Sequence, residues 1–362
     1  MDKKTIVLAA GGTGGHVFPA YAVAERLLKE GHTVHLITDE RGAEFKNRPK
    51  KLSVSILPLA RRTHGFKATI LLLLSLIPGF FLSFYYLLRF EPSVILGFGG
   101  FPSVPTILSA IFLRPFTRHK IILHEQNAVL GRANKKFLWF AQALATSFPN
   151  TRGIRKSFQH KVHLAGNPVR PIFRDAMEPY TPLKAGDPIR LLVIGGSQGA
   201  RSFSTAIPQA LSQLPENLRQ DLHVVQQSRP ELLDATRAAY KKLGIHITAE
   251  PFFQNIHELM GKAHLIICRS GSSTVFEVAH TRRPAFYIPF PYAMDNHQYF
   301  NAHSIVNLKG GWVLEEKEIH QLSALLKSLL EDPKTLATAA QNVHDLVKKD
   351  TLQCFSTLIQ TL

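Results

Sequence analysis

The sequence predicts an α/β protein made of two doubly wound, Rossmann-like halves, each built on a parallel sheet. The main observation is a unit that occurs twice, about 185 residues apart: Thr5–Ala10 runs into Gly11–His16, and Leu191–Ile194 runs into Gly195–Arg201. In both copies an apolar run typical of a buried strand leads through a glycine-rich turn into a helical pattern. Such a turn presents backbone N–H groups at the positive end of a helix dipole, which favours bound phosphate. We therefore expect two nucleotide-fold domains that face each other across a cleft.

In the N-terminal half, short apolar segments alternate with helical patterns, as they do in doubly wound sheets. The segment 166–171 is rich in turn-forming residues and resembles a linker, so we predict a first domain over residues 1–165. After the first strand, its elements are expected to be a helix at Tyr21–Glu30 and strands at Thr33–Thr38, Val54–Pro58, Val94–Gly97, Lys120–Leu123, Ala143–Thr146 and Val162–Ala165.

The C-terminal half repeats this alternation. We predict a second domain over residues 166–340 and a closing C-terminal helix over 341–362. After the strand Leu191–Ile194, its elements are expected to be a helix at Phe203–Leu214, strands at His223–Gln226, His246–Glu250, Leu265–Cys268, Ala285–Ile288 and Gly311–Leu314, and closing helices over 318–332 and 334–362.

Length and composition indicate a globular protein with two cores. The chain has 362 residues, of which 45% are hydrophobic, and this length is ample for two domains. Its two cysteines, Cys268 and Cys354, exclude a disulfide framework and a cysteine-based zinc site, and they fit a reducing compartment. Residues 1–4 lead directly into a strand without a signal-peptide pattern. A cytoplasmic location is therefore the expectation.

Positive charge is concentrated in the N-terminal half. Residues 1–165 contain 23 Lys and Arg against 8 Asp and Glu, a net charge of +15, whereas residues 166–362 contain 20 against 18, a net charge of +2. This asymmetry indicates a polyanionic partner, either nucleic acid or an anionic membrane. Nucleic acid is the weaker choice, because the basic residues flank apolar segments and no nucleic-acid-binding motif is present.

The uncharged stretch Thr69–Leu88 favours the membrane. Its length is that of a transmembrane helix, but Pro78-Gly79 interrupts it and the strand Val94–Gly97 follows at once. We favour one helix, or two short ones, whose apolar face enters the bilayer interface; a helix buried in the domain and a membrane-spanning helix are the alternatives. The basic residues near this stretch, which would be attracted to anionic lipid, are Arg61, Arg62, Lys67, Arg89, Arg114 and Arg118.

Three polar side chains of the first half are candidates for the chemistry. His16 follows two glycines at a helix start, where the dipole disfavours imidazolium, so a neutral general base is expected. A structural or solvent-facing histidine is the alternative. Glu125 and Asn127 end a strand of the same half and line the same cleft, or else form a hydrogen-bonded pair without a catalytic role.

A dinucleotide-binding protein is a competing interpretation of the glycine turns. Neither turn matches G-x-G-x-x-G, although Asp39 stands where the first turn would have its acidic ribose ligand. No D-x-D motif and no cluster of histidines or carboxylates is present, so we expect no metal site and no cofactor.

In the second half, Cys268–Glu277 places small polar residues where a strand ends and a helix begins. Ligands of open α/β sheets bind at this edge, and a diphosphate fits the N–H and hydroxyl groups there. Glu277, in the first turns of the helix, is suited to accept hydrogen bonds from a ribose diol. Ordinary N-capping by serine is the alternative. Gln298 follows a later strand and is suited to bind sugar hydroxyls, or is merely polar at a helix start.

Taken together, these motifs resemble one family, the bacterial cell-wall N-acetylglucosaminyltransferases that convert lipid I to lipid II (the MurG family). Each motif alone is modest, but the ordered set spans nearly the whole chain. At Phe101 the sequence departs from the family, which commonly has tyrosine there. The motifs are Gly11–His16, Gly97–Ser103, His124–Asn127, Gly166–Arg170, Gly195–Ala200, Arg269–Glu277 and Asp295–Ala302.

The resemblance implies a GT-B fold in which the C-terminal domain holds most of the nucleotide sugar. The donor, UDP-N-acetylglucosamine, is implied to contact Thr13, Gly14, Gly15, Asn127, Arg170, Ser197, the main chain at Phe253, Ser272, Ser273, Thr274, Glu277 and Gln298.

The resemblance also implies the reaction. An inverting, metal-independent displacement transfers N-acetylglucosamine to the C4 hydroxyl of the muramoyl sugar of lipid I, an undecaprenyl-diphosphate-linked muramoyl pentapeptide. The catalytic base is expected to be His16, with Glu125 as the rival. The enzyme is expected at the cytoplasmic face of the plasma membrane, as a peripheral protein. A GT-B transferase acting on another lipid is the nearer alternative, and a non-catalytic or NAD-linked membrane or nucleic-acid binder is the more distant one.

Overall fold

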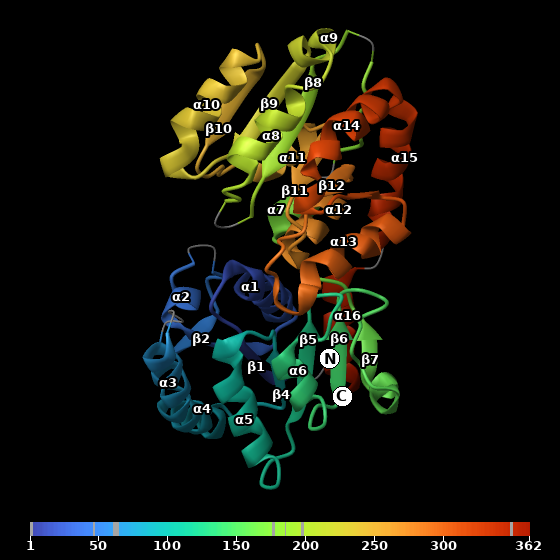
Figure 1. Ribbon diagram of the computed structural model, residues 1–362. Helices are drawn as coiled ribbons and strands as arrows, with labels where there is room; N and C mark the ends of the chain where they lie inside the picture. The colour runs from blue at the N-terminus through green and yellow to red at the C-terminus, as the bar shows by residue number, and fades with distance from the viewer. Residues whose placement is uncertain are drawn as a thin grey trace. The chain divides into compact units, whose positions relative to one another are not determined.

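A computed structural model describes residues 3–45, 48–60, 65–175, 178–184, 186–196, 199–347 and 350–362. The chain forms two compact units, Met1–Arg170 with Lys349–Leu362, and Pro171–Lys348. Each unit is a parallel sheet covered by helices (Figure 1), which confirms the predicted fold class. Unit 1 extends five residues beyond the expected boundary at residue 165, and it also contains the C-terminal segment, which the sequence had suggested as a separate closing helix.

Unit 1 has a seven-stranded sheet in the order β3-β2-β1-β4-β5-β6-β7. The strand order reverses between β1 and β4, and open α/β sheets bind ligands at the carboxyl ends of the strands beside such a point. The strands are β1 (Thr5–Ala9), β2 (Thr33–Asp39), β3 (Ser53–Leu57), β4 (Val94–Gly97), β5 (Lys120–Glu125), β6 (Ala143–Thr146) and β7 (Val162–Leu164). The helices are α1 (Gly14–Lys29), α2 (Glu40–Ala43), α3 (Phe66–Leu74), α4 (Leu76–Phe90), η1 (Phe101–Ser103), α5 (Val104–Leu113), α6 (Arg132–Phe137), η2 (Lys156–Lys161) and α16 (Thr351–Thr361).

Unit 2 repeats this plan with a six-stranded sheet in the order β10-β9-β8-β11-β12-β13, which reverses between β8 and β11. The strands are β8 (Ile189–Ile194), β9 (Leu222–Gln227), β10 (His246–Glu250), β11 (Leu265–Cys268), β12 (Ala285–Tyr287) and β13 (Gly311–Val313). The helices are α7 (Pro171–Asp175), α8 (Phe203–Leu211), α9 (Glu216–Gln220), η3 (Pro230–Leu232), α10 (Leu233–Lys242), α11 (Ile256–Lys262), α12 (Ser272–His280), η4 (Met294–Asn296), α13 (His297–Asn307), η5 (Glu316–Gln321), α14 (Leu322–Glu331), α15 (Pro333–Val343) and η6 (His344–Val347).

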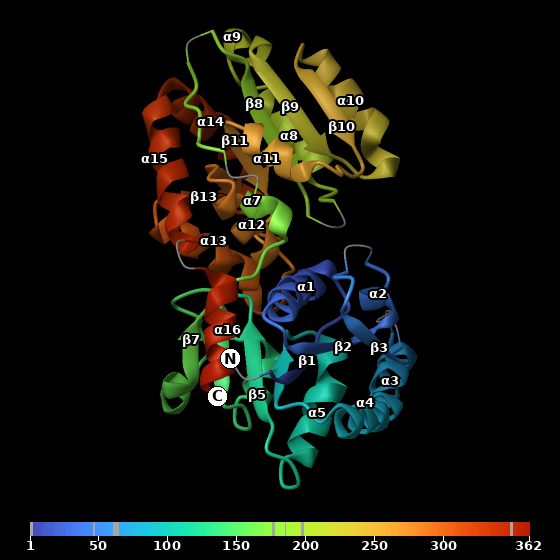
Figure 2. The same ribbon diagram turned by 180° about the vertical axis from the view of Figure 1, so that it is seen from behind.

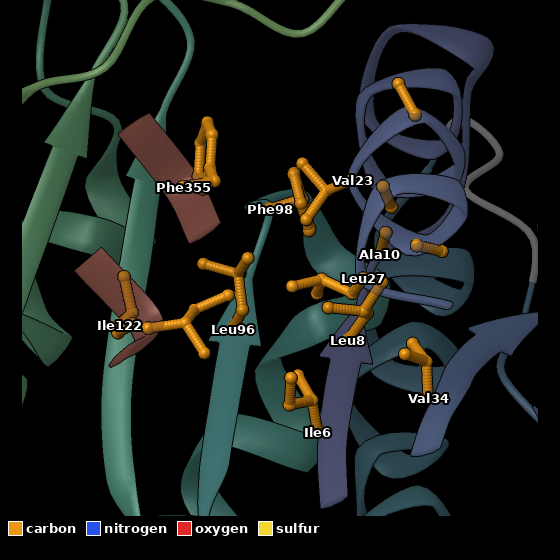
Figure 3. Packing of buried hydrophobic residues seen from close by; sticks show 14 of the residues in the cluster. Ile6, Leu8, Ala10, Val23, Leu27, Val34, Leu96, Phe98, Ile122 and Phe355 are labelled. Carbon is orange, nitrogen blue, oxygen red and sulfur yellow. The ribbon is translucent and has the colours of Figure 1, made fainter. Parts of the chain in front are cut away.

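The last helix, α16, packs on the sheet of unit 1 beside α1, as the view from behind shows (Figure 2). Its Phe355 is fully buried in the core cluster that contains Leu8, Leu96 and Phe98 (Figure 3). The closing helix expected over 334–362 is therefore several helices, and only the last belongs to unit 1. The chain thus passes from one unit to the other twice.

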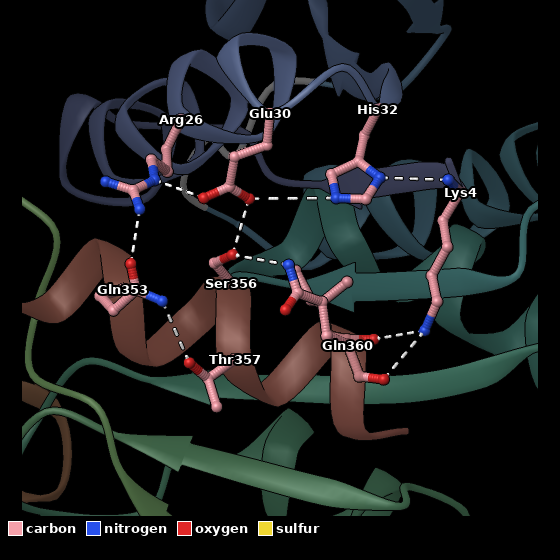
Figure 4. A network of polar contacts seen from close by, with 9 residues as sticks. Lys4, Arg26, Glu30, His32, Gln353, Ser356, Thr357 and Gln360 are labelled. Atoms are coloured by element: carbon pink, nitrogen blue, oxygen red, sulfur yellow. Dashed lines mark hydrogen bonds and ion pairs between the residues drawn. The ribbon is translucent and has the colours of Figure 1, made fainter. Parts of the chain in front are cut away.

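Polar contacts also attach α16 to unit 1 (Figure 4). The Nζ of Lys4 donates to the carbonyl oxygen of Ile359 at 2.7 Å, where a cation is favoured by the C-terminal end of the helix dipole. Ser356 donates to Glu30 at 2.6 Å, and Glu30 also pairs with Arg26. The helix is therefore an integral part of unit 1, although it is distant in sequence.

The apolar stretch forms two helices, α3 and α4, which meet at Ser75 and not at Pro78-Gly79 as expected. Pro78 is tolerated because it lies in the first turn of α4, where a missing N–H breaks no helical hydrogen bond. The stretch Ile70–Phe90 is long and apolar enough to cross a membrane, with mean hydropathy 2.1. Only 17% of it is buried inside the protein. The alternative of a helix buried in the domain is therefore wrong.

Candidate functional site

The predicted site residues of unit 1 lie at the carboxyl ends of its central strands. The buried Asp39, at the end of β2, stabilises the turn after β1. Its Oδ1 accepts hydrogen bonds from the backbone N–H of Gly12 at 2.8 Å and of Gly42 at 3.1 Å. Its Oδ2 accepts from Arg41 at 3.2 Å. Gly12 has a φ of +84°, which favours glycine. Asp39 therefore shapes the turn, because both of its oxygens accept hydrogen bonds from the protein itself.

Helix α1 begins within the glycine-rich stretch itself, at Gly14, with Thr13 as its N-cap residue. The Thr13 side chain forms no capping hydrogen bond, so it does not occupy the first backbone N–H groups of α1. Gly14 and Gly15 bring bare backbone into this first turn. The geometry is one in which an oxygen-rich ligand can approach the backbone closely.

His16 points its ring at the turn after β4. Its Nδ1 lies 2.9 Å from the carbonyl oxygen of Phe98. That oxygen can only accept, so this hydrogen bond forms in the tautomer that has the proton on Nδ1 and the lone pair on Nε2. The side-chain nitrogen of Gln126 lies 2.8 Å from Nδ1 and 3.4 Å from Nε2, and with Nδ1 protonated it can donate only to Nε2. A hydroxyl group that took the place of this amide would meet a nitrogen able to accept its proton.

Glu125, at the end of β5, is buried, and both of its carboxylate oxygens accept hydrogen bonds. Its Oε1 accepts from the backbone N–H of Asn127 at 3.0 Å, and its Oε2 accepts from the N–H of Gly131 at 2.8 Å and from Asn134 Nδ2 at 2.9 Å. Burial raises the pKa of this carboxyl, while these hydrogen bonds act in the opposite direction. The carboxylate ties the loop 125–134 together. Asn134, which the sequence did not indicate, is part of this arrangement.

The remaining predicted residues of unit 1 lie at the same edge. Asn127 is half-buried beside Glu125. Arg170, the last residue of the first segment of unit 1, places its guanidinium 5.1 Å from the ring centre of Phe18 on α1. This cation–π contact positions Arg170 near the start of that helix.

In unit 2 the turn after β8 is closed so tightly that Gly195 has no room for a side chain. A Cβ there would lie 1.9 Å from the backbone nitrogen of Ala200. The N–H of Gly195 donates to Gln227 Oε1 at 3.3 Å, a neutral group. Gly196 and Gly199 both have positive φ. Ser197, predicted as a donor contact, lies outside the described residues, as do Arg61 and Arg62.

Helix α12 begins directly after β11 and presents a polar face. Ser272 is buried in its first turn, whereas Ser273, Thr274 and Glu277 are half-exposed on one side. The other side, with Val275 and its neighbours, faces the core. The helical spacing therefore places two hydroxyls and one carboxylate together at the helix start, as the sequence predicted.

Arg269, just before α12, holds the carboxyl edge of unit 2 together. Its Nη1 donates to the carbonyl oxygens of Ile288 at 3.1 Å and Pro289 at 3.0 Å. Its Nη2 donates to Ser202 Oγ at 3.1 Å and pairs with Glu316. The buried guanidinium also lies over the rings of Phe203 and Phe290. The sequence motif contained Arg269 without indicating this role; a charge directly after a buried strand was the available signal.

Gln298 and Phe253 also lie at this edge. The side-chain oxygen of Gln298 accepts the N–H of Phe290 at 3.0 Å, so its two amide N–H groups are the donors available to a ligand. Phe253 is half-buried in the loop after β10. Among the described residues, no three His, Cys, Asp or Glu side chains are grouped so as to hold a metal ion.

The chain matches known proteins along almost its whole length. Residues 6–146 match the glycosyltransferase family 28 N-terminal domain, and residues 190–354 match the glycosyltransferase family 28 C-terminal domain. Two curated relatives carry the name UDP-N-acetylglucosamine–N-acetylmuramyl-(pentapeptide) pyrophosphoryl-undecaprenol N-acetylglucosamine transferase. That of Zymomonas mobilis is 37% identical over 99% of this chain and 92% of its own, and that of Sinorhizobium fredii is 40% identical over 100% and 96%.

Solved structures also match this chain over almost its whole length. The crystal structure of Acinetobacter baumannii MurG matches with a TM-score of 0.79 and 26% identity, over 99% of this chain and 100% of that one. The calicheamicin glycosyltransferase CalG4 matches with a TM-score of 0.66 at 13% identity, over 100% and 98%, which shows a shared fold only. The chain belongs to the MurG family of GT-B glycosyltransferases, the UDP-N-acetylglucosamine-dependent transferases named above.

Proposed function

We propose that this protein transfers N-acetylglucosamine from UDP-N-acetylglucosamine to the C4 hydroxyl of the muramoyl sugar of lipid I. UDP leaves, a β-1,4 bond forms, and the product is lipid II, the precursor for peptidoglycan synthesis. The observation that carries the proposal is full-length similarity at 37–40% identity to proteins named for this reaction. It is supported by two carboxyl-edge sites of different chemistry, one in each unit.

His16 is the proposed catalytic base. As the C4 oxygen attacks the anomeric carbon from the face opposite UDP, its proton passes to Nε2, and the configuration at that carbon inverts. With the Phe98 carbonyl oxygen bound to Nδ1–H, Nε2 accepts once the acceptor hydroxyl takes the place of the Gln126 amide. Glu125 is the weaker candidate, because its two oxygens hold the loop 125–134.

The donor is proposed to bind mainly to unit 2. The start of α12 offers N–H groups and the hydroxyls of Ser272, Ser273 and Thr274 to the diphosphate, whose charge the helix dipole stabilises. Glu277 accepts hydrogen bonds from the ribose, and Gln298 donates to the sugar. The main chain at Phe253 contacts the nucleoside. From the first unit, Thr13, Gly14, Gly15, Asn127 and Arg170 complete the proposed set, which requires no metal and no cofactor.

Unit 1 is proposed to bind the cytoplasmic face of the plasma membrane through an exposed apolar surface. This apolar surface comprises Leu71, Leu73, Leu74, Ile77, Phe81, Tyr85 and Leu88 of α3 and α4, Phe112 and Phe116 at the end of α5, and Trp139 and Phe140 after α6. α4 packs against both α3 and α5, and a large exposed apolar patch marks a membrane or partner site. Exposed basic residues lie near it in the sequence, namely Arg89, Arg114, Arg118, Lys135 and Lys136.

The topology favours a helix pair lying in the interface over one that spans the bilayer. β3 precedes the apolar stretch and β4 follows it, and both belong to one sheet. α4 buries Gly79, Ser83 and Leu87 on one face, and Ser83 hydrogen-bonds to Thr106 of α5 at 3.2 Å. One face of α4 is thus committed to the protein, which leaves the opposite face for lipid.

The first experiment is transfer of labelled N-acetylglucosamine from UDP-N-acetylglucosamine to a lipid I analogue in the presence of a chelator. Transfer of the sugar under these conditions is expected. If no transfer occurs while UDP still raises the melting temperature, the acceptor assignment is wrong and another lipid must be tested. If NAD raises the melting temperature and UDP does not, the transferase proposal itself fails.

The membrane proposal is tested by co-sedimentation with vesicles that contain phosphatidylglycerol. Phe81→Ser is expected to reduce vesicle binding by about tenfold, because one large apolar side chain no longer leaves water. Phe252→Ser removes an equally exposed ring from unit 2 and serves as the control. Equal binding by both variants would contradict the assigned surface.

A further inference from the structure

The turn beside His16, residues 97–100, has one side chain, that of Phe98. After β4 the sequence is Gly97-Phe98-Gly99-Gly100, and Gly99 and Gly100 have φ of +78° and +79°. Three of these four residues have no side chain to pack. The ring of Phe98 is therefore the side chain through which this turn packs into the core, while the backbone is held by the N–H of Phe98 on the carbonyl oxygen of Ala9 at 2.9 Å and by the hydroxyl of Ser103 on that of Gly100 at 2.9 Å.

That anchor rests on the C-terminal helix. The Phe98 ring is buried, and it stacks on the ring of Phe355 of α16, with centroids 6.2 Å apart and planes at 24°. His124 of β5 closes the cluster, with its ring edge-on to Phe98 at 5.4 Å and to Phe355 at 5.3 Å. Both phenyl rings are labelled in Figure 3, with Phe355 coming from α16. Phe355, near the end of the chain, thus supports the turn that follows β4.

Phe355 is itself held firmly. Asp350 caps α16 by accepting hydrogen bonds from the N–H of Leu352 at 3.0 Å and of Gln353 at 3.1 Å. Lys4 and Glu30 bind the helix further along (Figure 4). At the helix start, Thr351 fills the space where a Cβ of Gly166 would lie, 2.5 Å from its Oγ1. The position of the Phe355 ring is therefore determined from both ends of α16.

We propose that Phe355 is a positioning residue for His16, acting through Phe98. The inference rests on the proposed role of His16 as the base. The ring of Phe355 supports the ring of Phe98, the Phe98 carbonyl orients Nδ1–H, and the imidazole then directs Nε2 at the acceptor hydroxyl. The C-terminal helix thereby becomes part of the catalytic scaffold of unit 1, beyond its contribution to the core.

The test compares Phe355→Ala with Ile359→Ala in the full-length enzyme. Ile359 is a matched control, since it is fully buried on the same helix in the same core cluster and has no ring to stack on Phe98. Phe355→Ala is expected to lower kcat by about tenfold more than Ile359→Ala does, because a small misplacement of a catalytic group is costly. KM for UDP-N-acetylglucosamine is expected to stay within about twofold of wild type.

Two further readouts separate positioning from loss of stability. In Phe355→Ala the acid limb of the pH profile of kcat/KM is expected to move to lower pH, since the weakened bond to Phe98 no longer stabilises the protonated ring. Phe355→Leu, which refills most of the volume, is expected to recover most of kcat.

The inference is overturned if Phe355→Ala loses no more kcat than Ile359→Ala and its pH profile does not move. The proposed function is judged separately: if the wild-type enzyme transfers no sugar, or if His16→Ala remains active, then the function or the base is wrong irrespective of Phe355.

Discussion

The two glycine turns share one architecture and differ in what holds them. In unit 1 the carboxylate of Asp39 accepts the N–H of Gly12, so an anion of the protein itself occupies part of the turn. In unit 2 the N–H of Gly195, the first glycine of its turn, is bound by the neutral amide of Gln227. The guanidinium of Arg269 organises the loops around this second turn. The same strand-turn-helix unit is thus equipped for different partners.

This difference favours the proposed binding of the diphosphate to unit 2. A phosphate placed at Gly12 would compete with Asp39 for the same N–H and would be repelled by its charge. Unit 1 instead carries an imidazole whose Nδ1 lies beside the Phe98 carbonyl oxygen, and a large apolar surface, whereas unit 2 carries hydroxyls at a helix start. The repeated architecture therefore supports an acceptor-side base in one unit and donor binding in the other.

The largest expected effect is that of His16→Ala. Removing a general base is expected to lower kcat by about a thousandfold, equivalent to about 4 kcal/mol of barrier, while the affinity for UDP stays within about twofold because the donor binds mainly to unit 2. Steady-state kinetics and calorimetric titration with UDP give these quantities. His160→Ala, an exposed histidine of the same unit, is the control. Turnover within about threefold of wild type, or about 0.7 kcal/mol, would exclude His16 as the base.

The next largest effect is expected for Arg269→Met. Removing the cation leaves Glu316 and two carbonyl groups without their partner, at an expected cost of about 3 kcal/mol in the free energy of unfolding. UDP should then no longer raise the melting temperature at concentrations that saturate wild type. Arg237→Met, at a half-exposed arginine of the same unit, should cost less than about 1 kcal/mol. Equal losses in both variants would show that Arg269 does not organise the edge.

Acid is expected to destabilise both units. Burial lowers the pKa of His124 in unit 1 to about 3 and that of His264 in unit 2 to about 4. Between those values and about 6.5 the unfolded chain binds protons that the folded chain does not, so stability falls as pH drops below about 6.5. At pH 5 each histidine should cost about 2 kcal/mol.

Urea unfolding at a series of pH values measures this dependence. His124→Phe should reduce the slope of stability against pH below about 6.5, whatever its effect on stability at neutral pH. An unchanged slope in this variant would contradict the role of His124.

The smallest effect is expected for Asp39→Asn. The amide oxygen still accepts from Gly12 and Gly42, and only the pairing with half-exposed Arg41 is lost, so the unfolding free energy should fall by about 1 kcal/mol or less. Affinity for UDP, measured by calorimetry, should not change. A rise of about threefold or more in affinity would instead place the diphosphate near this carboxylate, in unit 1.

Local patterns were sufficient for the elements that bear the site. Apolar runs followed by glycines located the carboxyl ends of β1, β4 and β8, because a buried parallel strand must be apolar and the turn after it must be tight. The helical spacing of Ser273, Thr274 and Glu277 likewise placed them on one side of α12. These features depend on residues close together in the chain, so the sequence shows them directly.

Contacts between distant segments decided the rest. Asp39 and Glu125 have the residue types of ligands or bases, yet their oxygens are engaged by N–H groups that only the folded chain brings to them. Nothing local distinguishes a carboxylate that binds substrate from one that holds a loop.

The sequence by itself therefore determined the doubly wound fold, the edge of each sheet that carries the site, and the apolar and basic character of the first half. Only the tertiary structure decided that the C-terminal helix completes unit 1, that Arg269 joins the loops of unit 2, and that His16 Nδ1 lies beside the carbonyl oxygen of Phe98. The physical reason is that strand and helix periodicity are encoded by neighbouring residues. Hydrogen-bond saturation and ring packing depend on partners that can be hundreds of residues away, as Phe355 is from Phe98.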